Sequence, residues 1–571
     1  MTHSAYLQII LFVILLAILT KPLGIYLYNV LDPKGKTGLE FLLKPLERFT
    51  YCLCGIDAEQ EQTWKQYLFS LLIFCFMGML FTAAILFLQP ILPLNPQGFA
   101  SVKGGLNWST AISYITNTDW QSYSPETTLS YFSQMFAMTV QNFTSAAAGI
   151  GVAAALVRGI SRSSRTTLGN FWVDLTRLTY YLLLPLALVF AVVLVSEGVP
   201  QNFNGYAKAQ TLESGSEQMI VQGPIASQEA VKLLGTNGGG FTKANSAHPY
   251  ENPTPLSNWL QTLAMILLPS AQTYFFGRSV QNQKHGWYLF GTMLVLFLVG
   301  LFAITYFESQ GNPLFQKFHI DIAQGNFEGK EQRFDLIDTT LFSATTTAAS
   351  CGASNGSFSS FMPLSGVILL ENMQVGEMIF GAVGSGLYNM IAIVIIGIFV
   401  AGLIVGKTPE YLGKKIESFE IKMAITPLLI IVFSILVPTA ASCLTVWGGV
   451  ELGRNKPHIF TEILYAFSSS ATNNGSCFAS LNSNTPWYHA TLSGAMLAGR
   501  FLIACAILAL SGSLAAKKKH PPSEATFPIS GATFVLLIIG TIFLFGALSF
   551  FPSLCFGPIN EYFRLIYEVL S

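Results

Sequence analysis

The sequence predicts an all-α, polytopic membrane protein with about ten transmembrane helices, and three observations predict it. Of the 571 residues, 51% are hydrophobic and only 11% are charged, less than half of the roughly 25% typical of soluble domains. Apolar runs long enough to cross a ~30 Å hydrocarbon core recur along the chain. Polar strings return between these runs at a nearly constant spacing. The apolar content excludes disorder, and the net charge of zero gives no indication of a nucleic-acid partner.

Ten apolar runs are expected to span the membrane, because each is long enough to cross the hydrocarbon core. They are 4–28, 66–88, 128–157, 171–195, 257–277, 286–307, 366–405, 424–446, 488–514 and 529–551. The seventh run is too long for one straight crossing, and Gly381, Gly384 and Gly386 are predicted to break it.

The loops between the runs alternate in character. One set is short and basic, and the other is longer and carries fewer Lys and Arg. Since short basic loops stay in the cytoplasm, both termini are predicted to face outside. Lys517, Lys518 and Lys519 favour a topology anchor, with contact to anionic lipid or to a partner as the alternative.

Several classes of site are disfavoured. The eight cysteines are scattered without a CxxC pair, which favours reduced, buried thiols over a disulfide framework. The seven histidines show no zinc-ligand spacing. The chain has no GxxxxGK[ST] loop, so no ATP site is expected in it. A membrane-embedded enzyme is disfavoured because no nucleophile–base or metal constellation is recognisable.

Four long loops each contain a modest helical stretch, a polar string and a return to apolar sequence. The strings are Thr116-Asn117-Thr118-Asp119, Thr236-Asn237-Gly238-Gly239, Ser350-Cys351-Gly352-Ala353 and Thr472-Asn473-Asn474-Gly475. Their first residues lie 120, 114 and 122 positions apart, which indicates internal duplication. Each unit is predicted to read span, re-entrant helix, string, span. Spans two to nine then form four fused units around a pseudo-fourfold axis, with one extra helix at each end.

This pattern divides the chain into six segments. They are 1–65 (first span and basic cytoplasmic loop), 66–165 (first repeat), 166–285 (second repeat), 286–423 (third repeat, with the broken second span), 424–520 (fourth repeat) and 521–571 (tenth span and C-terminal tail).

The strings have the chemistry of a cation filter. Non-helical backbone at membrane depth is tolerated only where it is buried in protein or lines a watery cavity. Four copies around an axis can supply rings of carbonyl oxygens that replace the hydration shell of a monovalent cation. Each re-entrant helix would aim its negative C-terminal end at that cation. Asp119 is the only acid in the four strings, which argues against a divalent-cation filter. A single Gly-rich string is usually only a flexible turn, but chance does not explain four at one period.

Two charges lie inside predicted spans. Arg500 falls in the middle of the ninth, and Glu377 lies in the broken seventh, so each is a candidate partner of the other. Such a pair either blocks straight passage below the strings or only fixes the broken helix against its neighbour. The glycines Gly381, Gly384 and Gly386 either form a gate or allow close helix packing.

Two further polar residues follow the first and second strings. Gln121 and Asn245 are candidates for supporting a filter through hydrogen bonds. The alternative for both is a polar residue in a wet vestibule.

The sequence resembles the potassium-binding subunits of the Kdp potassium pumps, the KdpA family, over essentially the whole chain. The stretches that carry the resemblance are Thr116 to Gln121, Leu234 to Phe241, Ser350-Cys351-Gly352, Gly376-Glu377-Met378 with Gly381 to Gly386, Ser470 to Ser476, and Gly499-Arg500-Phe501. Each is weak alone, and together they are specific. One departure is Asp119, where the family leads us to expect Asn; an acid at this position either raises cation affinity at the mouth of a filter or weakens its selectivity.

The resemblance implies a function and partners. A subunit of this family takes K⁺ from outside through the four strings and delivers it through an intramembrane tunnel to a P-type ATPase catalytic subunit. It implies, in addition, a single-span auxiliary subunit, a small helical subunit and a place in the bacterial inner membrane. The chain itself would be non-catalytic. The alternative is a stand-alone potassium channel or secondary transporter of the same superfamily.

Overall fold

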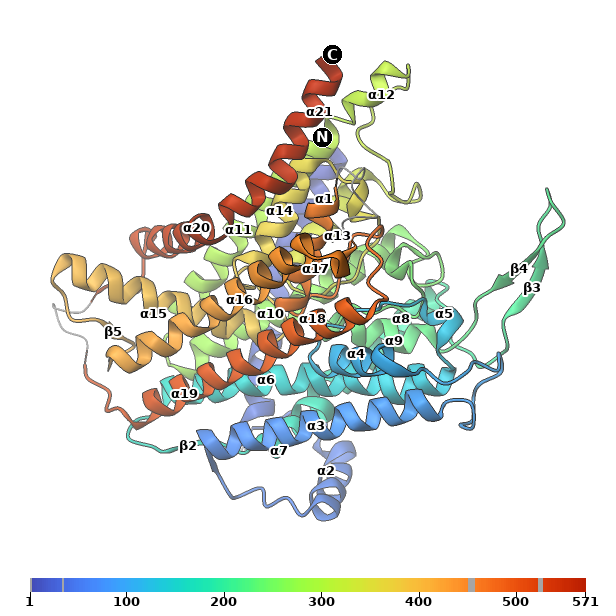
Figure 1. Cartoon of the computed structure of the whole chain (residues 1–571). Coiled ribbons are helices and arrows are strands. Elements are labelled where there is room, and N and C mark those ends of the chain that lie inside the picture. Colours follow the sequence, from blue (N-terminus) through green and yellow to red (C-terminus); the bar gives the residue numbers. More distant parts are fainter. Residues whose placement is uncertain (1–2, 33–34, 450–457, 522–526, 571) are drawn as a thin grey trace.

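A computed structural model describes residues 3–32, 35–449, 458–521 and 527–570. Long helices form the body, and the first and last helices both reach its upper part in the view of Figure 1. Strands in these ranges form three short antiparallel pairs. They are β1 (Gln62–Thr63) with β2 (Thr167–Gly169), β3 (Ala207–Gln210) with β4 (Glu217–Ile220), and β5 (Glu410–Tyr411) with β6 (Lys414–Lys415). The β3–β4 hairpin projects from the body (Figure 1).

Helices occupy all ten predicted spans. They are α1 (His3–Leu31), α3 (Trp64–Leu88), α6 (Val140–Ser161), α7 (Phe171–Arg177) with α8 (Leu184–Ser196), α10 (Pro255–Ser279), α11 (Gln283–Ser309), α14 (Pro363–Gln374) with α15 (Ser385–Val405), α16 (Ser418–Leu444), α18 (Pro486–Leu497) with α19 (Ile503–Ala516), and α20 (Ala532–Leu554). Among the described residues, nine helical stretches are apolar and long enough to cross a membrane. The helix outside this set is α10, whose buried polar residues, including Asn258, Gln261 and Gln272, face protein rather than lipid.

The remaining helices are shorter. Four of them precede the polar strings: α4 (Gly104–Ile115), α9 (Ile225–Leu234), α13 (Leu336–Ala348) and α17 (Ile459–Ala471). The others are α2 (Glu40–Cys54), α5 (Pro125–Thr128), α12 (Pro313–Lys317) and α21 (Asn560–Leu570). Each predicted re-entrant stretch is therefore helical up to the edge of its string.

The seventh predicted run is broken, as expected. The chain is non-helical between the end of α14 at Gln374 and the start of α15 at Ser385. Gly381 and Gly384 lie in this break with positive φ angles of 59° and 103°. Gly386 does not, because it belongs to the first turn of α15. The predicted place of Gly386 in the break was therefore wrong.

Several spanning helices contain a π-helical turn, which widens the helix and is frequent at functional sites. One such turn, Ser133–Thr139, leads into α6, and another, Leu178–Leu183, joins α7 to α8. A third, Ala498–Leu502, joins α18 to α19 and contains Arg500. The fourth, Cys555–Ile559, joins α20 to α21.

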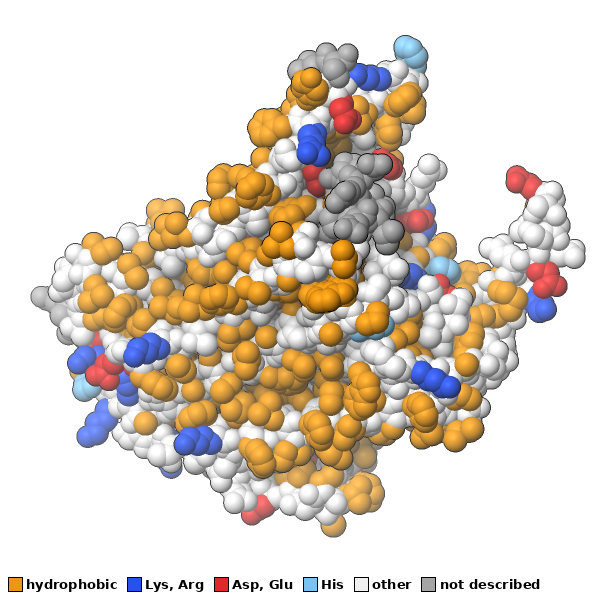
Figure 2. Space-filling view, in the orientation of Figure 1, with side chains coloured by type: hydrophobic (Ala, Val, Ile, Leu, Met, Phe, Trp, Pro, Cys, Tyr) orange, Lys and Arg blue, Asp and Glu red, His pale blue; other side chains and the backbone are white. Residues whose placement is uncertain are grey.

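The outer helices and the surface fit a membrane environment. The N-terminal helix α1 packs on α10, where Thr20 Oγ1 donates to Ser270 Oγ over 3.0 Å. The last spanning helix, α20, packs against α11 and α15. Hydrophobic side chains cover most of the visible body, and charged ones gather mainly at its left edge and top (Figure 2). This distribution is typical of a protein whose middle lies in lipid.

Candidate functional site: four polar turns around one axis

The four re-entrant helices end in the same turn. In each, the N–H of the second residue past the cap donates to the carbonyl oxygen five residues earlier, as in a Schellman motif. These bonds are Thr118 to Ser113 (3.0 Å), Asn237 to Lys232 (2.8 Å), Cys351 to Thr346 (2.9 Å) and Asn474 to Ser469 (2.8 Å). The residues before these donors are left-handed, with φ of 64° at Asn117, 49° at Thr236, 47° at Ser350 and 51° at Asn473. Four segments far apart in sequence thus share one backbone conformation.

The shared turn corrects the register of the strings. The predicted alignment placed Thr236 and Ser350 opposite Thr116 and Thr472. In the structure, the residues that cap the helices at the position of Thr116 and Thr472 are Gly235 and Ala349. The second and third strings are therefore shifted by one residue, so that Gly235 and Ala349 enter the site unpredicted.

A second left-handed residue follows two positions later in every turn. It is Asp119 (φ 52°), Gly238 (96°), Gly352 (89°) or Gly475 (95°). A β-carbon on Gly238 would overlap the carbonyl oxygen of Cys351. In the same way, one on Gly352 would overlap the carbonyl of Asn474, and one on Gly475 would overlap that of Thr118. The second turn therefore lies against the third, the third against the fourth, and the fourth against the first.

Side-chain hydrogen bonds also join neighbouring turns, and one of them links the first turn to the second. Asn117 Nδ2 donates to the carbonyl of Thr236 over 2.9 Å, linking the first turn to the second. Ser350 Oγ donates to the carbonyl of Thr472 over 2.8 Å, and Asn473 Nδ2 donates to Thr118 Oγ1 over 2.9 Å. The side chains thus bind adjacent turns to one another. The four turns thus form a closed ring of contacts that is buried in protein.

Asp119 stands where the other three turns have glycine. Its carboxyl is 2% exposed, and the amide of Asn142 on α6, with its nitrogen facing the carboxylate, lies 2.7 Å from Oδ2. Gly239 in the second string makes room for it, since a β-carbon there would lie 2.8 Å from Asp119 Cβ. Asp and Asn tolerate the left-handed region better than other side chains, so an acid can occupy this glycine position.

Asn245 donates to the backbone of the second string, and Gln121 donates to Gly240, the residue that follows the string. Gln121 Nε2 donates to the carbonyl of Gly240 over 2.9 Å and to the hydroxyl of Tyr114 over 2.8 Å. Asn245 Nδ2 donates to the carbonyl of Gly238. Both residues therefore contact the second string or the residue directly after it.

The broken segment between α14 and α15 reaches two of the turns. The N–H of Val383 donates to Thr236 Oγ1 over 3.0 Å, and that of Gly381 to the carbonyl of Ala348 over 3.1 Å. The N–H of Gly384 donates to Gln272 Oε1 over 3.1 Å. A β-carbon on Gly384 would overlap the carbonyl of Gly149 in α6. The non-helical backbone of this segment is thus satisfied by protein groups, as membrane depth requires.

Glu377 and Arg500 do not form the direct ion pair that the sequence suggested. Both belong to the described part of the chain, and their charged groups do not come within 4.0 Å of each other there. Ser385 Oγ donates to the carboxylate of Glu377, whose φ of 60° turns the chain at this point. Arg500 Nη2 instead donates to the carbonyl of Ser145 over 2.6 Å. Its guanidinium lies beside Gly149, next to the carbonyl of Val383, so it still borders the broken segment.

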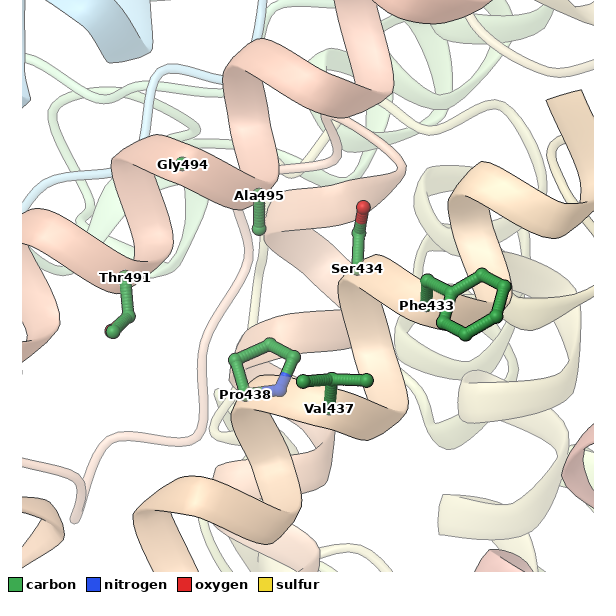
Figure 3. Close-up of a pocket in the computed structure, with 7 residues that line it drawn as sticks. All are labelled: Phe433, Ser434, Val437, Pro438, Thr491, Gly494 and Ala495. Atoms are coloured by element: carbon green, nitrogen blue, oxygen red, sulfur yellow. The ribbon is translucent and has the colours of Figure 1, made fainter.

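A surface groove of about 420 Å³ lies away from these turns. It runs between α16 and α18 and is lined by Phe433, Ser434, Val437, Pro438, Thr491, Gly494 and Ala495 (Figure 3). No titratable group lines it, and its aromatic and aliphatic side chains suit lipid contact. The ring of turns, rather than this groove, is therefore the candidate functional site.

Comparisons with known proteins agree with this geometry. The family model "Potassium-transporting ATPase A subunit" matches residues 10–563. A potassium-transporting ATPase potassium-binding subunit from Methylacidiphilum infernorum is 51% identical over 570 residues, covering 99% of each chain. One from Solibacter usitatus is 49% identical over 565 residues, again covering 99% of each chain.

A solved structure shares the fold. The potassium transporter TrkH from Vibrio parahaemolyticus superposes with a TM-score of 0.52, at 13% sequence identity, and the match covers 88% of this chain and 97% of that one. At this identity the likeness shows a common architecture only.

Proposed function

The chain belongs to the family of potassium-transporting ATPase A subunits, and we propose that its four turns form the selectivity filter through which it takes up K⁺ from outside. It is the non-catalytic, potassium-binding subunit of a potassium-transporting ATPase and spans the membrane several times. The filter residues are those of the four strings, extended by Gly235 and Ala349.

The observation that carries the proposal is the repeated turn. Four left-handed turns lie in a ring, where the glycines of three turns contact backbone carbonyls of the next turn. Side-chain hydrogen bonds also join neighbouring turns. Carbonyl oxygens held in such a ring can replace the water shell of K⁺, and each preceding helix directs its negative end toward the ion. A monovalent ion fits because Asp119 is the only acid in the strings, and its carboxylate is engaged by Asn142 rather than by another charged group.

We propose that the ion does not continue straight through the protein. The segment from Val375 to Gly384 bonds to the second and third turns, and Arg500 places a positive charge beside it. A cation leaving the turns would therefore meet a closed backbone and a like charge. We infer that it leaves sideways, through an intramembrane tunnel to an ATPase catalytic subunit, and that Gly381 and Gly384 let the segment move.

The proposed assembly follows the family. It contains a P-type ATPase catalytic subunit, a single-span auxiliary subunit and a small helical subunit, in the bacterial inner membrane with both termini of this chain outside. The six-segment division of the chain, with four repeats between two extra helices, is part of the same proposal. The second candidate is a stand-alone potassium channel or secondary transporter of the same superfamily.

The deciding experiment replaces a crowded glycine of the ring. Gly475→Ala would push a methyl group into the carbonyl of Thr118, so we expect loss of discrimination between K⁺ and Rb⁺ in ion-stimulated ATP hydrolysis by the intact transporter. Gly406→Ala is the matched control, because Gly406 has a similar left-handed φ of 71° but open space around it. Unchanged discrimination in Gly475→Ala would overturn the filter assignment. Full transport activity of the chain purified alone would favour the second candidate.

A further inference from the structure

A fully buried lysine lies directly behind the second turn. Lys232 is in the last turn of α9, and its backbone carbonyl accepts the N–H of Asn237 in the second string over 2.8 Å. Its side chain is 0% exposed. Lys232 Nζ lies 2.7 Å from Glu229 Oε1, 3.1 Å from Glu251 Oε2 and 2.8 Å from Asn245 Oδ1. Lys232 thus contacts the second turn through its backbone and the segment after it through its side chain.

The charge of Lys232 is offset by its neighbours. A lone ammonium at the C-terminal end of this helix would repel an ion held by the turns. The carboxyl groups of Glu229 and Glu251 both bind this ammonium and offset its charge. Both carboxylate side chains are fully buried, where charges act over longer range than in water.

The cluster fixes the orientation of one amide. An ammonium can only donate hydrogen bonds, so the atom of Asn245 that faces Lys232 must be its oxygen. The amide nitrogen of Asn245 is thereby turned to the carbonyl of Gly238, to which it donates. The link from Lys232 through Asn245 to Gly238 leaves no alternative orientation of the amide.

The second string needs such a link more than the others do. Gly238 is followed by Gly239 and Gly240, whereas Asp119, Gly352 and Gly475 are each followed by a residue with a side chain. Three consecutive glycines restrict the backbone least, so their peptide planes depend on contacts from outside the string.

The cluster is itself held rigidly. Glu251 Oε1 accepts from both the N–H and the hydroxyl of Thr242 over 2.6 Å. Gln261 Nε2, on α10, donates to the backbone carbonyl of Glu251 over 2.8 Å. The position of Lys232 is therefore set by α9, by the segment after the string and by α10.

We infer that Lys232 is a positioning residue for ion selection: through Asn245 it holds the Gly238–Gly239 peptide of the second turn in the orientation that K⁺ binding requires. This inference rests on the proposed function, since it assumes that the turns bind the ion. Glu229 and Glu251 hold the ammonium and offset its charge.

The test compares Lys232→Met, Asn245→Ala and the double variant in the intact transporter with its partner chains. The readouts are the K⁺ and Rb⁺ concentrations that give half-maximal ATP hydrolysis, together with the maximal rate. We expect each single variant to need about tenfold more K⁺ and to discriminate less against Rb⁺, with a maximal rate within about twofold of the parent. The double variant should lose no more than Asn245→Ala alone, because Lys232 acts through Asn245.

Lys330→Met is the matched control. Lys330 is also buried and lies 2.8 Å from Glu308, but its side-chain contacts are outside the strings. It should lower stability without changing the ratio of K⁺ to Rb⁺. If Lys232→Met does not fold, Asn245→Ala decides alone, since it removes the link without leaving buried carboxylates unpaired.

The outcomes separate this inference from the proposed function. Unchanged ion discrimination in folded Lys232→Met or Asn245→Ala, or strictly additive losses in the double variant, would overturn the positioning role. If Gly475→Ala nevertheless changes the discrimination between K⁺ and Rb⁺, the filter assignment is supported and only the positioning role of Lys232 is wrong. If Gly475→Ala also leaves this discrimination unchanged, both the filter assignment and the positioning role of Lys232 are wrong.

Discussion

The hydroxyl of Thr236 accepts a 3.0 Å hydrogen bond from the backbone N–H of Val383, which joins the second turn to the broken segment between α14 and α15. Thr236 is a β-branched residue in the left-handed region, where such side chains are rare, so its conformation must be imposed by its surroundings. One side chain therefore connects the second turn to the broken segment, which we propose closes the ion path below the turns.

Thr236→Val tests this connection. Valine keeps the shape of threonine but leaves the buried N–H of Val383 without its acceptor, at a cost of about 1–3 kcal/mol. We expect faster hydrogen exchange across residues 375–384, measured by mass spectrometry. Thr292→Val is the control, because the Thr292 hydroxyl donates only within its own helix, to the carbonyl of Tyr288. Equal exchange in both variants would mean that Thr236 does not hold the segment.

Asp119 gives a second prediction, because an acid replaces the glycine of the other turns. Asp119→Asn keeps an oxygen that accepts from Asn142, so it should retain K⁺ affinity within about threefold. Asp119→Ala loses that bond and should weaken K⁺ binding by about tenfold. Potassium titration of ATP hydrolysis distinguishes the two. Equal losses of K⁺ affinity in the two variants would show that the negative charge, which both remove, matters more than the bond to Asn142.

Arg500 gives a third prediction, which concerns ion leak. Arg500→Gln removes the positive charge next to the broken segment while keeping a donor for the carbonyl of Ser145. We expect a downhill K⁺ leak without ATP that is at least about tenfold above the parent, measured in proteoliposomes. Arg500→Lys keeps the charge and should stay tight. A leak in the Lys variant as large as in the Gln variant would assign Arg500 a packing role instead.

The C-terminal helix gives a prediction of pH dependence. His458 Nδ1 lies 2.8 Å from Glu561 Oε2, which joins the start of α17 to α21 beyond the apolar helix α20. The hydrogen bond with this carboxylate, helped by the charges of Glu462 and Glu328 and opposed by partial burial, raises the pKa of His458 above 6.5. Because the folded-state pKa is the higher one, the stabilisation is complete below pH 6.5 and is lost as the pH rises through the raised value.

Hydrogen exchange of α21 at pH 6 and pH 8.5 measures this loss. Exchange in α21 should be faster at the higher pH than the intrinsic pH effect predicts. In His458→Asn, which has no titrating ring, the excess should vanish. An excess of the same size in the variant would assign the pH effect to another group.

The spans and the strings were predictable because they depend on local composition. Hydropathy located a helix in each of the ten predicted runs, and nine of these are apolar and long enough to cross a membrane in the described residues; α10 is not, because of its polar residues. The break in the seventh run followed from its length and its glycines. These features need no knowledge of which residues meet in space.

The register of the turns was not predictable from matching letters. The Thr-Asn pairs at Thr116 and Thr236 look equivalent, but the end of the preceding helix determines the turn, and α9 ends so that Gly235 takes the place of Thr116. The left-handed residues could have been aligned only by knowing where each helix stops. Helix ends are the least certain feature of a sequence-based prediction.

Polar contacts between residues far apart in the sequence could not be predicted from it either. The sequence predicted that Arg500 and Glu377 pair, because both are charged residues inside predicted spans. In the structure Arg500 lies in a π-helical turn and donates to the carbonyl of Ser145 instead. Nothing local in the sequence marks Lys232 as part of the site, because its partner Glu251 lies beyond the second string. Only the folded chain brings the two together.

The four turns belong to a single polypeptide and are not identical, which has a practical consequence for experiment. In a homotetramer, one codon change alters every quadrant at once, so a graded response is hard to obtain. Here a substitution at Gly238, Gly352 or Gly475 alters one quadrant alone. Combining these substitutions would alter one, two or three of the four turns in a graded series. A single labelled residue would report on one known turn.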